Sequence, residues 1–300
     1  MKIKNPLKRT DVFSCTHGAH QGFNGKVSAY HVLREKHCYP SGCIYFLWRC
    51  VRLEKGNRCV HGYTTPGRKC KGCTYYVEEK LHFQPILLLS PEVYSQFVED
   101  VENYENWLEK IRFTQQAIAG KIDTVKPWFE KHVFPDRTRI DLRGYLLVFK
   151  RGFIGMDMFE DPFYVRISHG QMQEYGFLPK MKVEMVGEIR EDRGRIVVQH
   201  IRQVEKKTKG WGWHWTRDKA LVAVKTATEF EHQPEKCIAC PSGALVDVTE
   251  LTETEERKYR RLYCLKGIVE PSVCCVSAFN ALKKAKSFTE SIPTSQTHLH

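Results

Sequence analysis

Residues 139–159, RIDLRGYLLVFKRGFIGMDMF, decide which fold we expect for this chain of 300 residues. Aromatic and branched side chains are frequent in this stretch, and glycines interrupt it. Such a composition is typical of β-strands, and a glycine inside a strand allows a sharp bend. A second strand-like stretch, PFYVRIS, follows at 162–168. We therefore expect three strands between residues 139 and 168.

The next segments predict a short helix and a hairpin. Residues 170–177, GQMQEYGF, are helical in character, and Gly176 supplies a stop signal. Two further strands, KMKVEMVGEI (180–189) and RIVVQHIRQVE (195–205), are separated by a turn that contains Gly194. Three strands, a helix and two strands are the element order of an OB-fold, and residues 136–205 resemble one in spacing and length. The resemblance implies a small β-barrel that binds single-stranded nucleic acid or oligosaccharide on one face.

Before this region, residues 90–120 predict an amphipathic helix. Ser90 is a candidate N-cap, Pro91 suits the first helical position, and Gly120 is the expected stop. Apolar side chains recur every three or four residues from 93 to 111. We interpret residues 87–132 as a helical spacer.

The twelve cysteines lie in two clusters, seven between residues 15 and 73 and five between 237 and 275. In an intracellular chain, clustered cysteines are more often metal ligands than disulfide partners. In the second cluster, EKCIACPSGALVDV (235–248) places a C-x-x-C before a strand-like run and resembles a zinc knuckle. An iron–sulfur segment is the alternative, although the further cysteines of a bacterial ferredoxin run are missing. The predicted ligands are Cys237, Cys240, Cys264 and Cys274, with Cys275 as a substitute for the last.

Residues 253–263, ETEERKYRRLY, lie between these thiols and predict a helix that begins with a capping box at Thr252 and Glu255. In the N-terminal cluster the predicted ligands are Cys50, Cys59, Cys70 and Cys73, with Cys38 and Cys43 as substitutes. The histidines at 17 and 20 are weaker candidates, and buried cysteines without a metal are the alternative. The expected cofactor is Zn²⁺, or else a [4Fe-4S] cluster.

The net charge is +12, and the first 80 residues carry ten more basic than acidic side chains. Concentrated positive charge favours a polyanionic partner. Nucleic acid is a better candidate for that partner than a membrane surface. A solvated basic face with no partner is the alternative. A redox protein partner would suit the iron–sulfur interpretation.

Unpaired bases stack on aromatic side chains, while basic side chains bind the phosphates. On the expected barrel the candidate contacts are Tyr145, Phe149, Lys150, Arg151 and Phe153, with Arg166 and Arg195 beside them. The following segment, KKTKGWGWHWTRDK (206–219), alternates indoles with small or polar residues. Its candidate contacts are Lys206, Lys207, Lys209, Trp211, Trp213 and Trp215. The alternatives are aromatics that fill the barrel core and indoles that seat the next domain on it.

Catalytic motifs do not emerge from the sequence: a P-loop, a dinucleotide fingerprint, HExxH and GxSxG are all missing. His37 beside Cys38 is a weak candidate for a nucleophile pair. The carboxylates of residues 157–161 are better explained by a polar turn, and a Mg²⁺ site is the alternative. The opening residues have no apolar core of a signal peptide, and the longest apolar runs are too short to span a bilayer.

The sequence therefore predicts a cytoplasmic, non-catalytic, metal-stabilised nucleic-acid-binding protein of the α+β class, with an iron–sulfur electron-transfer protein as the alternative. The expected domains are a basic Cys/His-rich module (1–86), the helical spacer (87–132), an OB-like barrel (133–208), a Cys-rich module (209–286) and a flexible tail (287–300).

Overall fold

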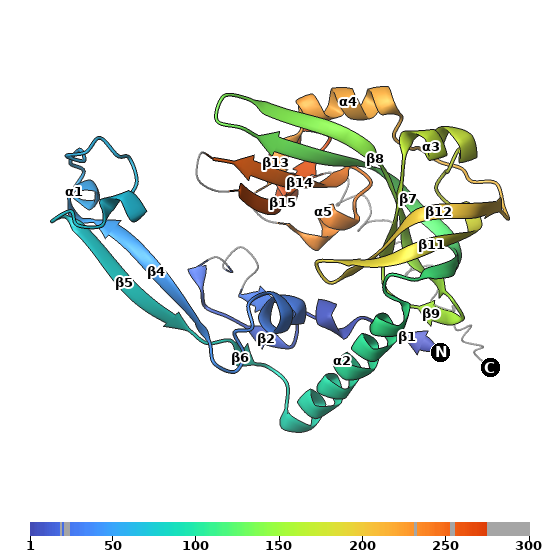
Figure 1. Ribbon diagram of the computed structural model, residues 1–300, viewed down its shortest axis with the longest axis horizontal. Helices are drawn as coiled ribbons and strands as arrows, with labels where there is room; N and C mark the ends of the chain where they lie inside the picture. Colours follow the sequence, from blue (N-terminus) through green and yellow to red (C-terminus); the bar gives the residue numbers. More distant parts are fainter. Residues whose placement is uncertain (19, 21–24, 231–232, 253–255, 275–300) are drawn as a thin grey trace, which may run out of the picture. The chain divides into compact units, whose positions relative to one another are not determined.

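The computed structural model describes residues 1–18, 20, 25–230, 233–252 and 256–274, so the predicted tail lies outside the described residues (Figure 1). By its contacts the chain divides into two compact units. The N-terminal unit is Asn5–Glu109, and the C-terminal unit combines Met1–Lys4 with the chain from Lys110 onward. The fold is mixed, mostly sheet with few helices. Among the described residues, no helix is both long enough and apolar enough to cross a membrane.

The N-terminal unit contains two small sheets and one long helix. Strand β2 (Phe13–Ser14) pairs with β3 (Lys26–Val27) and with β6 (Ile86–Leu87). Strands β4 (Cys43–Cys50) and β5 (Tyr76–Phe83) form an antiparallel ladder, and α1 (Val51–Glu54) follows β4. A one-turn π-helix spans His31–Glu35.

Helix α2 (Pro91–Ile111) begins where the sequence predicts, with the Ser90 hydroxyl accepting the Val93 N–H at 3.5 Å. The same face that the periodicity predicts is buried, and Phe97 and Tyr104 are almost fully enclosed. The prediction that the helix continues to Gly120 is wrong. Phe113 has a φ of 64°, a left-handed conformation that ends a helix, and the chain then enters a strand. The predicted spacer is therefore helical only as far as residue 111.

Strand β7 (Gln115–Val133) opens the main sheet of the C-terminal unit. The predicted order of three strands, a helix and two strands then follows and is confirmed. These elements are β8 (Thr138–Ile154), β9 (Asp157–Phe159), β10 (Phe163–Ile167), α3 (His169–Tyr175), β11 (Lys182–Asp192) and β12 (Arg195–Lys206). Ser168 forms a complete capping box at the start of α3, and Gly176 ends it with a φ of 57°. Strand β1 (Lys2–Ile3) pairs with β9.

Five of these strands pair in a circuit that returns to its first member. Strand β7 pairs with β8, β8 with β10, β10 in parallel with β12, β12 with β11, and β11 again with β7. We call this set the five-strand circuit. Its first strand lies within the segment predicted to be helical, which is why the sequence placed the beginning of the sheet too late.

The interior of the five-strand circuit is apolar and tightly packed. The Phe149 and Phe163 rings stack with centroids 4.8 Å apart, and both side chains are fully buried. Gly120 lies directly under Phe149: a Cβ added there would be 2.8 Å from the ring carbon Cδ1. The glycine is therefore a packing position inside a strand rather than a helix stop.

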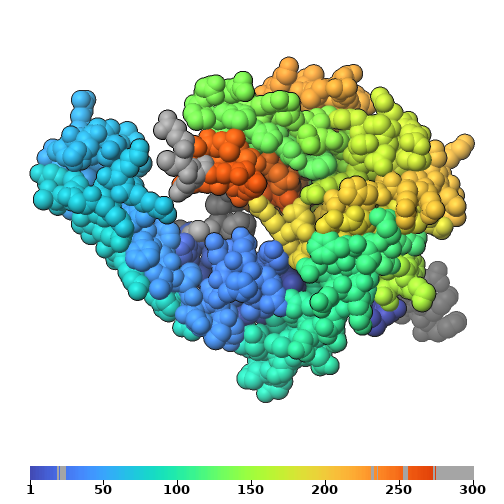
Figure 2. All heavy atoms as spheres, viewed as in Figure 1, coloured from blue at the N-terminus to red at the C-terminus, as the bar shows by residue number. Residues whose placement is uncertain are grey.

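After the circuit come α4 (Arg217–Lys225), β13 (Thr228–Phe230), α5 (Glu235–Ala239), β14 (Gly243–Leu251) and β15 (Glu256–Cys264). Strand β14 pairs in parallel with the second half of β7, so that the orange atoms of β14 and β15 lie against the green atoms of β7 and β8 in Figure 2. The strand predicted after the C-x-x-C is confirmed.

The helix predicted for residues 253–263 is wrong, because the described part of it is β15. Every residue from Glu256 to Cys264 has a partner in β14, so pairing with the neighbouring strand overrides the local helical preference. The expected cap residue Glu255 lies outside the described residues.

Candidate nucleic-acid interface

The segment after β12 presents two of its three indoles to solvent. The residue exposure of Trp211 is 70% and that of Trp213 is 52%, whereas Trp215 is 4% exposed. Gly212 has a φ of 113°, which only glycine adopts readily, and it sets the direction of the chain between the two exposed rings. The backbone N–H of Trp211 donates to the Pro179 carbonyl at 2.9 Å. The exposed indoles therefore extend from an anchored backbone.

Trp215 is buried, as expected for the alternative in which an indole packs inside the protein instead of binding a base. Its Nε1–H donates to the Pro241 carbonyl at 2.9 Å, and its ring contacts Trp213 edge-on at 4.6 Å. The predicted set of three indoles on one face is therefore divided: two are available to a ligand, and the third fixes the segment to the turn after α5.

The basic side chains predicted for this region are all exposed, but several already have partners. Lys207 binds Glu184 at 2.9 Å and Glu205 at 2.6 Å, and Lys206 donates to the Tyr175 carbonyl at 3.2 Å. Lys150 pairs with Asp123 at 3.1 Å. The other two predicted basic contacts, Arg151 and Lys209, are also exposed.

Two of the aromatic candidates on the sheet cannot stack with a base in this structure. Tyr145 is 3% exposed and Phe149 is fully buried, because alternation along β8 directs both into the apolar interior. The sequence alternative, that these rings fill the core, is the correct one for this pair. Phe153 is 43% exposed and stays a candidate contact.

The structure also contains a charged cavity of about 400 Å³ in the C-terminal unit. Its walls come from β10, from β11 and β12 with the turn between them, and from β14 and β15. Five basic side chains and three acidic ones line it, which leaves two positive charges in excess; they are Arg166, Arg190, Arg193, Lys258 and Arg260, with Glu191, Asp192 and Asp247.

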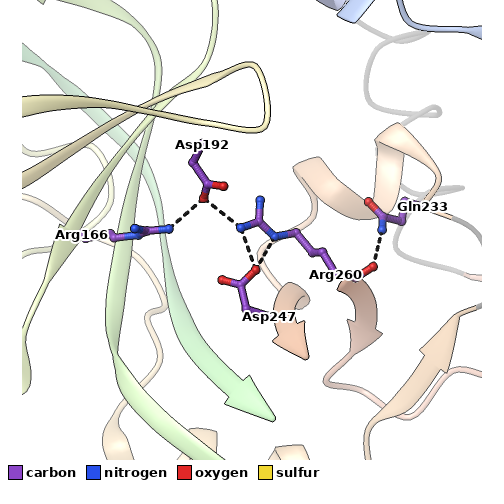
Figure 3. Close-up of polar contacts among 5 residues, drawn as sticks. All are labelled: Arg166, Asp192, Gln233, Asp247 and Arg260. Carbon is purple, nitrogen blue, oxygen red and sulfur yellow. Dashed lines mark hydrogen bonds and ion pairs between the residues drawn. The ribbon is translucent and has the colours of Figure 1, made fainter. Parts of the chain in front are cut away.

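A chain of ion pairs holds one side of this cavity together (Figure 3). The Asp192 carboxylate accepts from Arg166 and from Arg260, both at 2.8 Å. Arg260 also donates to Asp247 at 2.7 Å, and the Gln233 amide donates to the Arg260 carbonyl at 2.9 Å. One arginine therefore bridges two carboxylates that belong to different strands.

These contacts change the acid–base properties of the cluster. Burial alone would raise the pKa of Asp192, but Arg260 and Arg166 outweigh it and hold that pKa below its usual range. Burial would likewise lower the pKa of Arg260, and its two carboxylate partners raise it instead. Asp192 and Arg260 are thus both charged at neutral pH. The fixed guanidinium groups of the cluster suit the binding of an anion.

Arg193, next to Asp192 in the chain, occupies the turn between β11 and β12. Its φ is 50°, its side chain is exposed, and it forms no ion pair within the described part of the chain. Nearby, burial lowers the pKa of Arg195. Arg193 is the side chain of the cavity wall that is free to meet a ligand phosphate.

Of the basic side chains that line the cavity, sequence reasoning placed only Arg166 near a binding face and missed the others. Two of the missed side chains, Arg190 and Arg193, lie in a strand and turn that carry no motif. Lys258 and Arg260 were both assigned to a helix, which hid their role. The dense basic run RKYRR at 257–261 is the one signal in the sequence that could have directed attention there.

The C-terminal thiols lie on two neighbouring turns. Cys237 belongs to α5, and the N–H of Cys240 donates to its carbonyl at 3.2 Å. Cys264 ends β15 opposite Gly243, and its carbonyl accepts from Gly267 at 3.0 Å. Burial raises the pKa of Cys237, and the nearby thiols of Cys240, Cys274 and Cys264 raise it further. The structure therefore brings the four predicted ligands into one region.

A buried lysine supports this region from β7. The Lys126 ammonium donates to the carbonyls of Gly243, at 3.1 Å, and Ile238. Burial lowers its pKa to about 8. The α5–β14 turn is thus tied to the sheet by a side chain that the sequence analysis did not select.

The backbone places three of the predicted N-terminal ligands near the same end of the β4–β5 ladder. Cys50 lies opposite Tyr76, whose N–H donates to the Cys73 carbonyl at 3.0 Å, and the Cys73 N–H donates to Cys70 at 3.0 Å. Cys59 lies in the connecting segment, where its Sγ accepts from the His61 N–H at 3.4 Å.

The substitute ligands Cys38 and Cys43 belong to a different group. Burial raises the pKa of Cys38, and nearby Cys43 and Cys15 add to the shift. Among the described residues, no group of three or more His, Cys, Asp or Glu side chains has an arrangement that could hold a metal ion. The metal ligands therefore stay a prediction.

The carboxylates of residues 157–161 help to fix the N-terminus of the chain. Asp157 binds the Met1 ammonium at 2.9 Å, and Glu160 lies 3.6 Å from both Lys2 and Lys4. These contacts give the acidic turn a structural role.

The chain was compared with protein-family models, with curated proteins and with solved structures, and none of them matches it.

Proposed function

We propose that the protein binds single-stranded or structured nucleic acid without catalysing a reaction on it. The observation that carries this proposal is the exposure of Trp211 and Trp213 in a basic segment with an anchored backbone. Large aromatic side chains usually bury most of their surface. Two indoles left in solvent beside lysines provide the stacking surface that unpaired bases require.

The order of the five-strand circuit supports the same proposal. Strands β7, β8 and β10, the helix α3 and then β11 and β12 follow the sequence of elements in an OB-fold, with β7 as the first strand. We infer that the circuit is an OB-like barrel. In that fold, ligands bind over the second and third strands and the loop between the fourth and fifth. Those positions correspond here to Arg166 on β10 and Arg193 in the β11–β12 turn.

In this proposal the cavity binds phosphate and the indoles bind bases. The two features lie at either end of β12, a strand of twelve residues that bends at His200 and Gln203, both of which have positive φ. A ligand that reaches both would be an oligonucleotide rather than a single nucleotide.

The test is a binding titration of fluorescently labelled single-stranded DNA and RNA oligonucleotides of about 20 nucleotides with the full-length protein. We expect affinity to fall steeply as salt increases, because phosphate contacts release counterions. Trp211→Ala and Trp213→Ala should each weaken binding by about tenfold, in line with stacking energies of about 1–3 kcal/mol per base. Trp48→Ala, in the N-terminal unit, is the control and should bind like the parent. Equal affinity in all three variants would disprove the stacking role.

We also propose that the two cysteine clusters, one N-terminal and one C-terminal, bind structural zinc, with a [4Fe-4S] cluster as the alternative. The proximity of Cys237, Cys240, Cys264 and Cys274 favours a metal in the C-terminal unit. Elemental analysis of anaerobically purified protein tests this proposal. Zinc in a colourless preparation supports a structural metal. Iron with visible absorption would instead support the electron-transfer function, and neither metal would refute both.

A further inference from the structure

Two histidines in the N-terminal unit face each other through the nitrogens that commonly bind metals. The Nε2 atoms of His20 and His31 are 3.2 Å apart. Their rings are nearly perpendicular, at 87°, with centroids separated by 5.1 Å. His31 lies on the one-turn π-helix, while His20 comes from the segment between β2 and β3. The two imidazoles are therefore brought together by the fold and not by sequence proximity.

The separation of the two nitrogens matches the spacing of two ligands on one ion. Zn²⁺ binds imidazole nitrogen at about 2.0–2.1 Å, so two ligands at tetrahedral positions are about 3.3 Å apart. The observed 3.2 Å lies close to that value. A direct hydrogen bond would also fit the distance, but it would require one of the two Nε2 atoms to carry a proton.

The other nitrogen of His31 has the partner that a metal-binding histidine needs. Its Nδ1 lies 3.0 Å from the Glu35 carboxylate, which can only accept a hydrogen bond in its ionised form. In the tautomer that donates from Nδ1 to this carboxylate, the lone pair of Nε2 is available. Metal-binding histidines usually donate their second N–H to a carboxylate or a carbonyl in this way.

We propose that His20 and His31 bind a divalent transition-metal ion such as Zn²⁺, with Glu35 as the residue that orients His31. This site is separate from the two cysteine clusters, and it does not depend on the proposed nucleic-acid function. Two imidazoles fill two coordination positions, and the described residues contain no third side chain arranged on the same point. A further imidazole, that of His17, has its ring centroid 5.4 Å from that of His20. His17 or water completes the coordination.

The test uses full-length protein that is treated with a chelator, reloaded with Zn²⁺ and assayed for bound zinc. We expect His20→Ala and His31→Ala each to lose one zinc ion per chain, independently of any zinc held by thiols. His200→Ala is the matched control, because its Nδ1 also lies 3.0 Å from a carboxylate, that of Glu188. The control should retain the full zinc content, and His17→Ala separates completion by imidazole from completion by water.

A second measurement covers the case in which a histidine variant fails to fold. Glu35→Gln keeps the size of the side chain and both metal ligands, and it should weaken zinc affinity by about 10–100-fold with unchanged stoichiometry. In ¹⁵N-labelled parent protein, zinc should shift the Nε2 resonance of His31. An unshifted resonance, or unchanged zinc content in both histidine variants, would overturn the proposal in favour of a direct hydrogen bond.

Discussion

Arg260 is the residue on which the largest number of described polar contacts in the cavity converge. Its side chain is 10% exposed and binds carboxylates on two separate strands. A buried arginine of this kind contributes less through net attraction than through the penalty that follows its removal, because its partners would then be left as uncompensated charges.

Replacement of Arg260 by Met should therefore lower the free energy of unfolding by about 3 kcal/mol. The neighbouring Arg261 provides the control. Its side chain is 41% exposed and pairs with Glu229 at 3.2 Å, so Arg261→Met should change stability by less than about 1 kcal/mol. Urea unfolding of both variants measures the difference, and similar losses in the two would contradict the ranking.

Asp192 makes the stability of the cluster dependent on pH. Its pKa is lower in the folded protein than the ordinary value of about 3.9, so its contribution is fully present above that value and is lost as the pH falls through the folded pKa. The stability difference between the parent and Asp192→Asn should be constant from pH 5 to 7 and shrink below about pH 4. A difference that does not change at all as the pH is lowered from 5 toward acid unfolding would show that charge is not its cause.

Such residue-scale contacts could not be predicted from the sequence. Arg260 and Asp192 are 68 positions apart, and only the pairing of β14 with β7 brings their strands together. The exposure of Trp211 and Trp213 could be proposed from alternation alone, whereas the burial of Trp215 depends on a carbonyl 26 residues later.

At the scale of elements, local patterns identified most strands and missed the one with mixed signals. Strand β7 contains Gly120 and Pro127 and is separated from an amphipathic helix by only three residues, so its first part was taken for the end of that helix. Strand β15 was predicted to be a helix because its sequence has no apolar alternation. Its extended conformation comes from pairing with β14. Helix α3, in contrast, carries its own cap and stop and was correctly predicted.

The packing of Gly120 gives a direct check of this assignment. Gly120→Ala would place a methyl group against the Phe149 ring and should destabilise the protein by about 1–3 kcal/mol. Gly170→Ala is the control: it lies in α3, where the nearest atom to a new Cβ is 3.8 Å away. Because alanine is the better helix former, that variant should be equally stable or up to about 1 kcal/mol more stable. Thermal unfolding distinguishes the two, and equal shifts would argue against close packing at Gly120.

At the scale of the whole molecule, the long strand β7 connects the five-strand circuit to the C-terminal strands. Its first half pairs with β11, and Phe129–Val133 pair with β14, while β8 accompanies it along most of its length. The sequence predicts an OB-like barrel that ends at residue 208 and a Cys-rich module that begins at 209. By their contacts both belong to one compact unit.

A chain shortened to end at residue 208 should therefore expose one side of β7. We expect the backbone amides of residues 129–133 to exchange with solvent much faster in the shortened protein, and the protein to aggregate more readily through the unpaired strand edge. Hydrogen-exchange mass spectrometry measures the first effect. The amides of residues 163–167, in β10, are the internal control and should stay protected. Unchanged protection at 129–133 would show that β14 is dispensable.

The sharing of β7 has a consequence for how such a protein could be redesigned or could diversify. A module whose strands pair only with one another can be excised and grafted onto another host. Here the single strand β7 forms hydrogen bonds both with the five-strand circuit and with β14. Any recombination event that separated them would have to supply a substitute strand at the same moment. The natural breakpoint for domain exchange in this chain therefore lies before β7, near the end of α2, and not at the tryptophan segment.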